Sequence, residues 1–278
     1  MRRPRSVPNL SDRSNRLNPF LLNLLNLSTF EPSEPIEPIE PIEPFHPVTM
    51  CERDDDLVRQ QIAYYRERAR EYDEWFHRHG RYDRGPEHTR RWWDEVAEVR
   101  AALERAAPRG HILELACGTG IWTERLAPHA AHLTAVDASP EALAINRLRV
   151  AAPNVDYQCT DLFAWQPTAT YDFVFFGFWL THVPPARFDT FWALVGQALA
   201  EGGTVFLVDT RVQPEMRIDG SLNGGAAIRT LNDGRQFQIV KIFYEPAQLR
   251  ERLHGLGWYA DLHATATFFL YGTAKVNG

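Results

Sequence analysis

Residues 111–122, which read HILELACGTGIW, constrain the fold of this chain more than any other stretch. A short apolar run, Ile112, Leu113 and Leu115, breaks at the sequence ACGTG and is followed by residues that suit a helix. The pattern predicts a strand, a tight glycine turn and a helix. Glycine tolerates positive φ and carries no Cβ, so such a turn lets a ligand approach backbone N–H groups closely. We therefore expect a ligand site at this turn.

The residues after the turn help to separate two classes of ligand. A dinucleotide site favours G-x-G-x-x-G, but Thr123 occupies the position of the third glycine. Asp137 ends the next apolar run, about 20 residues on, where an acidic side chain can hold ribose hydroxyls. Ser139 and Pro140 then suit the first positions of a helix. A further strand ends in a second carboxylate, Asp161.

Strands and helices alternate along the second half of the chain. Apolar runs predict strands at 111–115, 132–136, 154–159, 172–176 and 204–209, with helices near 121–127, 140–150 and 185–199. This alternation indicates βαβ units and a mostly parallel sheet with helices on both faces. After these elements we expect a hairpin from 226–231 and 235–244, a helix over 246–256 and one long strand over 258–271.

The sequence E-x-A-C-G-x-G around the turn, with Asp137 and Asp161 following in order, resembles motif I of the class I S-adenosylmethionine-dependent methyltransferases. The resemblance covers residues 64–278. It implies an α/β fold with a single doubly wound, mostly parallel seven-stranded sheet, whose last strand inserts antiparallel between the fifth and sixth. It also implies S-adenosylmethionine as cofactor, held by Tyr65, Tyr72, Glu114, Ala116, Gly118, Gly120, Trp122, Asp137, Ala138, Asp161, Leu162 and Gly177.

The N-terminal part divides into two expected regions. Residues 1–50 contain a tandem Pro-Ile-Glu repeat, which favours extended chain and predicts a disordered leader; one hypothesis is that Met50 is the native start. Residues 51–108 are expected to be a helical lid, and residues 109–278 the methyltransferase domain. Apolar residues spaced by four and three over 58–76 predict one amphipathic helix.

Tyr65 and Tyr72 share the inner face of this predicted helix. The family resemblance extends to Y-x-x-R-A-x-x-Y-D, which Tyr65, Arg68, Ala69, Tyr72 and Asp73 match, and it implies that the helix covers the cofactor. Plain packing in the core is the alternative for both tyrosines. Arg66 and Arg70 lie off this face and should point to solvent.

Composition and charge exclude several functions. The net charge of −6 gives no basic field for nucleic acid. Cys51, Cys117 and Cys159 have neither C-x-x-C nor Cys/His spacing, so neither a disulfide framework nor a metal site is expected. No apolar run approaches the roughly 20 residues that span a bilayer. We expect a cytoplasmic protein without membrane or nucleic-acid partners.

The loop after the fourth predicted strand contains the best candidate for a catalytic group. His182 has an ordinary pKa that suits a base at neutral pH, although a histidine here can also simply tie the loop to a neighbouring helix. The loop lacks both the Asn/Asp-Pro-Pro-Tyr of nucleobase methyltransferases and the paired glutamates of arginine methyltransferases. Tyr82, Phe178 and Trp179 are the expected walls of a site for a small, partly apolar or aromatic acceptor.

The predicted function is methyl transfer from S-adenosylmethionine to oxygen or nitrogen of such a molecule. Two alternatives stay open at this stage. One is a nicotinamide-dependent oxidoreductase, against which Thr123 and Asp161 speak. The other is a protein that binds S-adenosylmethionine without turnover.

Overall fold

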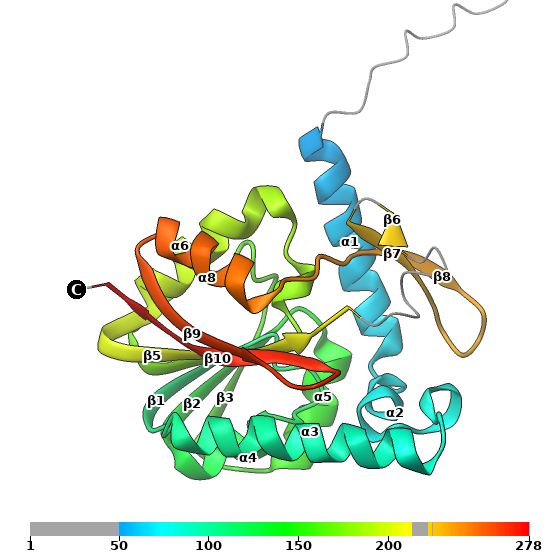
Figure 1. Cartoon of the computed structure of the whole chain (residues 1–278), viewed down its shortest axis with the longest axis horizontal. Coiled ribbons are helices and arrows are strands. Elements are labelled where there is room, and N and C mark those ends of the chain that lie inside the picture. The colour runs from blue at the N-terminus through cyan, green and yellow to red at the C-terminus, as the bar shows by residue number, and fades with distance from the viewer. Residues whose placement is uncertain (1–49, 213–221, 224, 278) are drawn as a thin grey trace, which may run out of the picture. The chain divides into compact units, whose positions relative to one another are not determined.

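Seven strands form the main sheet of this computed structural model, which describes residues 50–212, 222–223 and 225–277. The strand order is β3-β2-β1-β4-β5-β10-β9 (Figure 1). The first five run parallel to one another, and β10 inserts antiparallel between β5 and β9. The predicted doubly wound sheet is therefore confirmed. The strands are β1 Gly110–Leu115, β2 Ala130–Asp137, β3 Val155–Cys159, β4 Tyr171–Gly177, β5 Leu199–Thr210, β9 Trp258–Ala264 and β10 Phe269–Val276.

Helices cover both faces of the sheet, because buried strands point successive apolar side chains to opposite faces. In β4, Phe173 and Phe175 pack on the face that carries α3 (Pro86–Arg105), α4 (Thr123–Leu126) and α5 (Pro140–Val150). Val174 and Phe176 pack on the other face, with α6 (Phe188–Ala198) and α8 (Pro246–Gly255). The sheet thus lies between two apolar layers.

The start of α5 agrees with its sequence signal. The Ser139 hydroxyl accepts a hydrogen bond from the backbone N–H of Ala142 at 3.0 Å, and Pro140 is the first helical residue. The serine hydroxyl accepts from a backbone N–H that has no partner within the first turn of the helix. Proline suits the first helical position because an N–H there would make no hydrogen bond within the helix. A local signal was sufficient here.

The last strand differs from its prediction, because residues 258–271 hold two strands rather than one. Chain reversal occurs at residues 265–268, where Glu95 of α3 binds the turn. Its Oε2 accepts hydrogen bonds from the backbone N–H of Phe268 at 2.7 Å and from the Thr265 hydroxyl. The partner that stabilises the reversal is therefore distant in sequence.

Two helices are shorter than expected. The helix predicted near 121–127 is one turn, α4, followed by the 3₁₀ turn η2 (Ala127–His129), in which Pro128 has no N–H to continue the helix. The helix predicted over 58–76 is broken at residues 69–71 into α1 (Met50–Arg68) and α2 (Tyr72–His77). No proline or glycine marks that break, so its cause is tertiary.

Three short strands form a second sheet beside α1. They are β6 (Leu222–Asn223), β7 (Ala226–Thr230) and β8 (Gln236–Val240), all antiparallel (Figure 1). The hairpin of β7 and β8 matches the predicted one. Short 3₁₀ turns η1 (Gly80–Tyr82), η3 (Leu180–His182) and η4 (Pro185–Arg187) complete the described elements.

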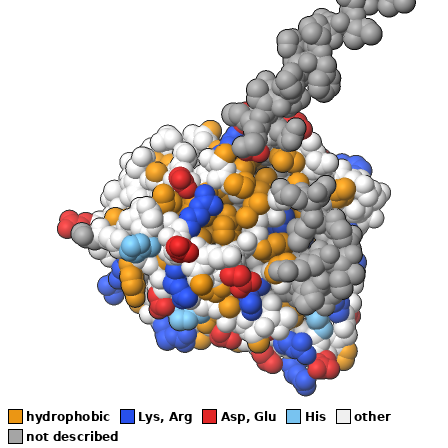
Figure 2. Space-filling view, turned by 45° about the horizontal axis from the view of Figure 1, so that its top comes forward, with side chains coloured by type: hydrophobic (Ala, Val, Ile, Leu, Met, Phe, Trp, Pro, Cys, Tyr) orange, Lys and Arg blue, Asp and Glu red, His pale blue; other side chains and the backbone are white. Residues whose placement is uncertain are grey.

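Residues 48–278 form one compact unit, and the leader predicted for residues 1–50 falls almost wholly outside the described residues. In the described part of the chain, no helix has the length and apolar character needed to cross a membrane. When the top of the view in Figure 1 is turned forward, a hollow comes into sight in which hydrophobic side chains gather (Figure 2). Charged side chains lie around it.

Candidate functional site

Asp137, at the end of β2, faces the glycine turn that follows β1. Its Oδ2 accepts a hydrogen bond from the backbone N–H of Gly118, and its Oδ1 accepts one from Ser139, both at 2.8 Å. Burial raises the pKa of Asp137 above its ordinary value, and these backbone N–H groups oppose the rise. The carboxylate joins the ends of two neighbouring strands and keeps lone pairs for a ligand.

The two glycines of the turn have different roles. Gly118 and Gly120 have φ angles of 52° and 92°, a region that favours glycine. A Cβ at Gly118 would meet no atom within 4 Å, whereas one at Gly120 would lie 2.6 Å from Oδ1 of Asn146 on α5. Gly120, which was predicted to contact the cofactor, lines none of the cavities described below. It allows α5 to pack against the turn.

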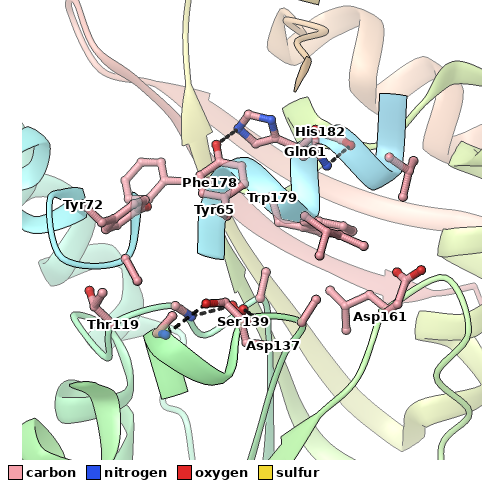
Figure 3. A pocket seen from close by; sticks show the side chains of 18 of the residues that line it. Gln61, Tyr65, Tyr72, Thr119, Asp137, Ser139, Asp161, Phe178, Trp179 and His182 are labelled. Atoms are coloured by element: carbon pink, nitrogen blue, oxygen red, sulfur yellow. Dashed lines mark hydrogen bonds between the residues drawn. The ribbon is translucent and has the colours of Figure 1, made fainter. Parts of the chain in front are cut away.

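A pocket of about 90 Å³, the inner pocket, lies between the turn and α1. Figure 3 shows Gln61 and Tyr65 on one side of it and Thr119, Asp137 and Ser139 on the other. Most of the residues predicted from the sequence line this pocket. They are Tyr65, Tyr72, Ala116, Gly118, Asp137, Ala138, Asp161, Leu162 and Gly177, together with Phe178, Trp179 and His182.

The predicted residues Glu114 and Trp122 line a recess of about 20 Å³ that shares Gly118 and Gly177 with the inner pocket. Glu114 is 1% exposed, and among the described residues neither its Oε2 nor Nε1 of Trp122 has a hydrogen-bond partner. Burial raises the pKa of Glu114 to about 8, and a hydrogen bond with Thr123 opposes the rise. The recess therefore offers one unpaired acceptor and one unpaired donor.

Two non-glycine residues of the inner pocket have left-handed backbone conformations. Ala116 has φ 54° and Phe178 has φ 58°. Residues with a Cβ rarely adopt this region, which costs about 1–3 kcal/mol and persists only where the surrounding structure enforces it. Both residues follow the carboxyl ends of adjacent strands, β1 and β4. Strained backbone thus gathers where a ligand would lie between these strands.

His182 lies on η3 and is 4% exposed. Its Nδ1 donates to the carbonyl of Val240 at 2.8 Å, because a carbonyl can only accept. Nε2 is then the acceptor for the Tyr65 hydroxyl at 2.9 Å (Figure 3). Burial, and after it the ammonium group of Lys241, hold the pKa of His182 well below its usual range. The imidazole is therefore neutral at neutral pH.

A second, larger cavity of about 350 Å³, the outer cavity, adjoins the inner pocket. Four residues line both spaces, and they are Tyr65, Tyr72, Phe178 and His182. We call these four residues the boundary. Of the predicted acceptor walls, Tyr82 and Phe178 line the outer cavity, whereas Trp179 lines only the inner pocket and packs against Phe163.

Positive charge distinguishes the outer cavity from the rest of this acidic chain. No aspartate or glutamate is among the described residues that line it. Seven cationic side chains line it, and they are Arg68, Arg78, Arg81, Arg84, Arg211, Arg229 and Lys241. Such a focused field favours an anion.

Several of these cations have no carboxylate partner in the described part of the chain. Arg81 pairs with Glu71 at 3.6 Å and Arg211 with Glu245 at 3.5 Å. Arg68, Arg78, Arg229 and Lys241 form no ion pair with a described residue.

Arg78 is the most unusual of the unpaired cations. It is 8% exposed, and its guanidinium lies 4.0 Å from the centroid of the Trp92 ring. Burial, and after it Arg84, lower the pKa of Arg78 to about 10. A buried cation without a counterion is costly, and a bound anion would offset that cost.

The sequence did not identify this cationic cavity. One signal was available, because Arg68 lies three residues after Tyr65 and four before Tyr72, on the stripe assigned to the inner face. A charged residue on an inner face is unusual, and Arg68 is indeed only 7% exposed. It donates to the Tyr82 hydroxyl at 3.3 Å. Arg66 and Arg70, in contrast, are exposed as expected.

Comparisons with known proteins point to one family. Residues 112–203 match a methyltransferase domain. The structure of the DhpI–SAH complex is 40% identical, with a TM-score of 0.67, and the match covers 80% of this chain and 98% of that one. The DhpI–SAM–HEP complex is 42% identical, with a TM-score of 0.66, over 79% and 98% of the two chains.

A curated relative is more distant. The ubiquinone biosynthesis O-methyltransferase of Aromatoleum aromaticum (strain DSM 19018 / LMG 30748 / EbN1) is 32% identical over 132 residues. That match covers 42% of this chain and 56% of the relative, so it spans little more than half of the relative's length.

Proposed function

Because this chain belongs to the class I S-adenosylmethionine-dependent methyltransferases, we propose that it transfers a methyl group to an oxygen of a small anionic molecule bound in the outer cavity. The observation that carries the proposal is the lining of that cavity, with seven cationic side chains and no acidic one among the described residues. Its aromatic walls suit the expected partly apolar or aromatic acceptor as well.

The residues of the inner pocket fit S-adenosylmethionine. Gly118 leaves open space where a side chain would block a ligand. Asp137 keeps lone pairs that can accept from ribose hydroxyls, and Asp161, which also lines the pocket, is the proposed partner of the adenine amino group. In the recess, Oε2 of Glu114 is the proposed partner of the cofactor's ammonium group, whose charge would lower the raised pKa of this carboxyl, and unpaired Nε1 of Trp122 is the proposed partner of its carboxylate.

The bound cofactor supplies an electrophilic methyl group on a sulfonium, and its transfer is an in-line displacement that depends on alignment. The chain's contribution is to place donor and acceptor on opposite sides of the boundary. Tyr65, Tyr72, Phe178 and His182 line both spaces, so we propose that the methyl group crosses between them. Enclosure by α1 keeps water from the reacting atoms.

The proposed role of His182 follows from its hydrogen bonds. Its only unprotonated nitrogen already accepts from Tyr65, and its low pKa makes it a weak base. An ionised oxygen needs no proton removed before it attacks. We therefore assign His182 to positioning Tyr65 and the acceptor. The relatives named as O-methyltransferases support oxygen as the methylated atom.

Matched acceptors test this function. Methyl transfer from labelled S-adenosylmethionine is measured with benzoate and phenyl phosphate, and with the neutral benzyl alcohol as control. We expect turnover of an anionic acceptor and little of the alcohol; the reverse preference would refute the anionic site. Thermal stabilisation by S-adenosylhomocysteine without turnover of any acceptor would favour a non-catalytic binding protein, and stabilisation by NAD alone would favour an oxidoreductase.

A further inference from the structure

Lysine is rare in this chain. Of 30 basic residues, only Lys241 and Lys275 are lysines. Lys241 directly follows β8, is 8% exposed and lines the outer cavity, whereas Lys275 lies exposed near the end of β10. A lysine offers a compact charge with three donors, and its pKa shifts readily on burial, unlike that of arginine. Lys241 brings these properties to the outer cavity.

Two threonines fix the ammonium group of Lys241. Nζ donates to Oγ1 of Thr181 on η3 at 2.7 Å and to Oγ1 of Thr210 on β5 at 3.1 Å. The Thr181 hydroxyl in turn donates to Asp209 at 2.8 Å. Asp209, 2% exposed, also accepts backbone N–H groups of Thr181 and Thr210 at 3.0 and 2.7 Å. The ammonium is thus held in one orientation.

The third donor of this ammonium points to no good partner in the described part of the chain. The nearest remaining acceptor in the described part of the chain is Nε2 of His182, at 3.5 Å, and this nitrogen already accepts from Tyr65 at 2.9 Å. That separation exceeds the usual 2.7–3.2 Å of an N–H hydrogen bond. A fixed cation therefore has a donor to spare next to the boundary.

We propose that Lys241 binds the oxygen of the anionic acceptor beside the boundary and so determines which acceptors are methylated. The inference rests on the proposed function and adds a specificity-determining residue to it. Arg68 and Arg78 would bind the remaining charge of the same molecule further along the cavity wall.

The charged groups around Lys241 come from four other elements. His182 lies on η3, Asp209 on β5, Arg229 on β7 and Arg68 on α1. Burial lowers the pKa of Lys241 to about 8, and Asp209 opposes this fall. The folded chain therefore holds the ammonium mostly charged near pH 7 and mostly neutral above pH 9. Binding of an anion should weaken over the same range.

Sulfate is a suitable probe, because its charge stays constant between about pH 7 and 9.5. Calorimetry measures sulfate binding to the full chain saturated with S-adenosylhomocysteine, at both ends of that range. We expect wild type to lose about 10- to 100-fold in affinity at the higher pH, the scale of one hydrogen bond to a charged group. Lys241→Met should be weakened by a similar factor near pH 7 and change little with pH. Lys275→Met should behave as wild type.

Two further results make the test decisive. Lys241→Arg keeps its charge at high pH, so its sulfate affinity should not fall between pH 7 and 9.5. Unchanged affinity for S-adenosylhomocysteine in all variants shows that they fold. If sulfate binds equally to wild type and Lys241→Met, the role of Lys241 is refuted while an anionic cavity stands. If sulfate does not bind wild type at all, the anionic acceptor itself is refuted.

Discussion

The hydroxyl of Tyr65 donates to Nε2 of His182 across 2.9 Å, and this bond joins α1 to η3 where the two cavities meet. The two rings are nearly perpendicular, at 81°, with centroids 5.3 Å apart. Val240 fixes the other nitrogen of the imidazole, so the imidazole cannot turn without breaking a bond. The pair therefore presents a defined surface to any molecule at the boundary.

Tyr65→Phe should lower the free energy of unfolding by about 0.5–1.5 kcal/mol, because a buried acceptor loses its donor. Tyr72→Phe is the matched control. The Tyr72 hydroxyl forms no hydrogen bond with a described residue, so its loss should change stability little. Urea unfolding of both variants measures the difference. Equal stabilities would contradict the importance of the bond to His182.

His182→Asn should reduce turnover by less than about tenfold if the histidine only positions its neighbours. General base catalysis typically contributes about 10²–10⁴-fold, so a loss on that scale would instead make His182 the proton acceptor. The pH profile separates the two roles further. A pKa held well below its usual range leaves the ring neutral near neutral pH, and we expect no inflection from it there.

Asp137→Ala should weaken binding of S-adenosylhomocysteine by about 1.5–3 kcal/mol, the range for hydrogen bonds to a charged group. The structure adds an effect on folding, because Asp137 also accepts from Gly118 and Ser139. Asp137→Asn keeps one of these acceptors and should be milder. Calorimetry on both variants tests the assignment, and unchanged affinity in the alanine variant would remove Asp137 from the ribose site.

Glu114 makes the stability depend on pH. Its pKa rises from the ordinary 4.5 to about 8 on folding, so the folded chain holds this proton more tightly than the unfolded chain. The stabilisation of the folded state by the protonated Glu114 carboxyl is complete below pH 4.5 and is lost as pH rises through 8. Compared with Glu114→Gln, the wild type should lose on the order of a few kcal/mol between pH 5 and 8.5. Parallel pH profiles for the two proteins in urea unfolding would show that Glu114 is ionised throughout.

Arg78→Met should lower kcat/KM for an anionic acceptor by about 10- to 100-fold, since a charge-assisted bond is lost. Stability should stay the same or rise, because an unpaired buried cation is replaced by an apolar side chain. Arg90→Met, on the exposed side of α3, is the control and should change neither quantity. A fall in stability without a change in kcat/KM would make Arg78 a structural residue.

Local signals in the sequence predicted the sheet and the glycine turn well. The apolar run 111–115 became β1, and Ser139 with Pro140 marked the start of α5. These predictions succeeded because strand alternation and helix capping depend on residues close together in the chain. Asp137 and Asp161 line the same pocket because parallel strands present their carboxyl ends at one edge of the sheet.

The features that failed depend on distant contacts. Glu95 binds the reversal at residues 265–268 from about 170 positions earlier, so nothing near 258–271 marks a break. The break of the predicted 58–76 helix has a similar origin. It lets Asp73 on α2 bind Thr119 of the glycine turn at 2.6 Å and pair with Arg149 on α5.

Apart from the position of Arg68, the cationic cavity left no signal in the sequence for the same reason. Lys241 meets Thr181 and Thr210 across 60 and 31 positions. Only the fold brings these residues together with Arg68 of α1, Arg78, which follows α2, and Arg229 of β7.

Gln61 has a consequence for the order of the catalytic cycle. From the inner face of α1 it donates to the His182 carbonyl at 3.1 Å and accepts from the backbone N–H of Val240 at 3.2 Å. Lifting α1 would break both bonds at once and would also remove Arg68 from the outer cavity. The proposed acceptor site is thus complete only while α1 covers the inner pocket. We expect an obligatory sequence, in which the methyl donor binds first and the demethylated donor leaves last.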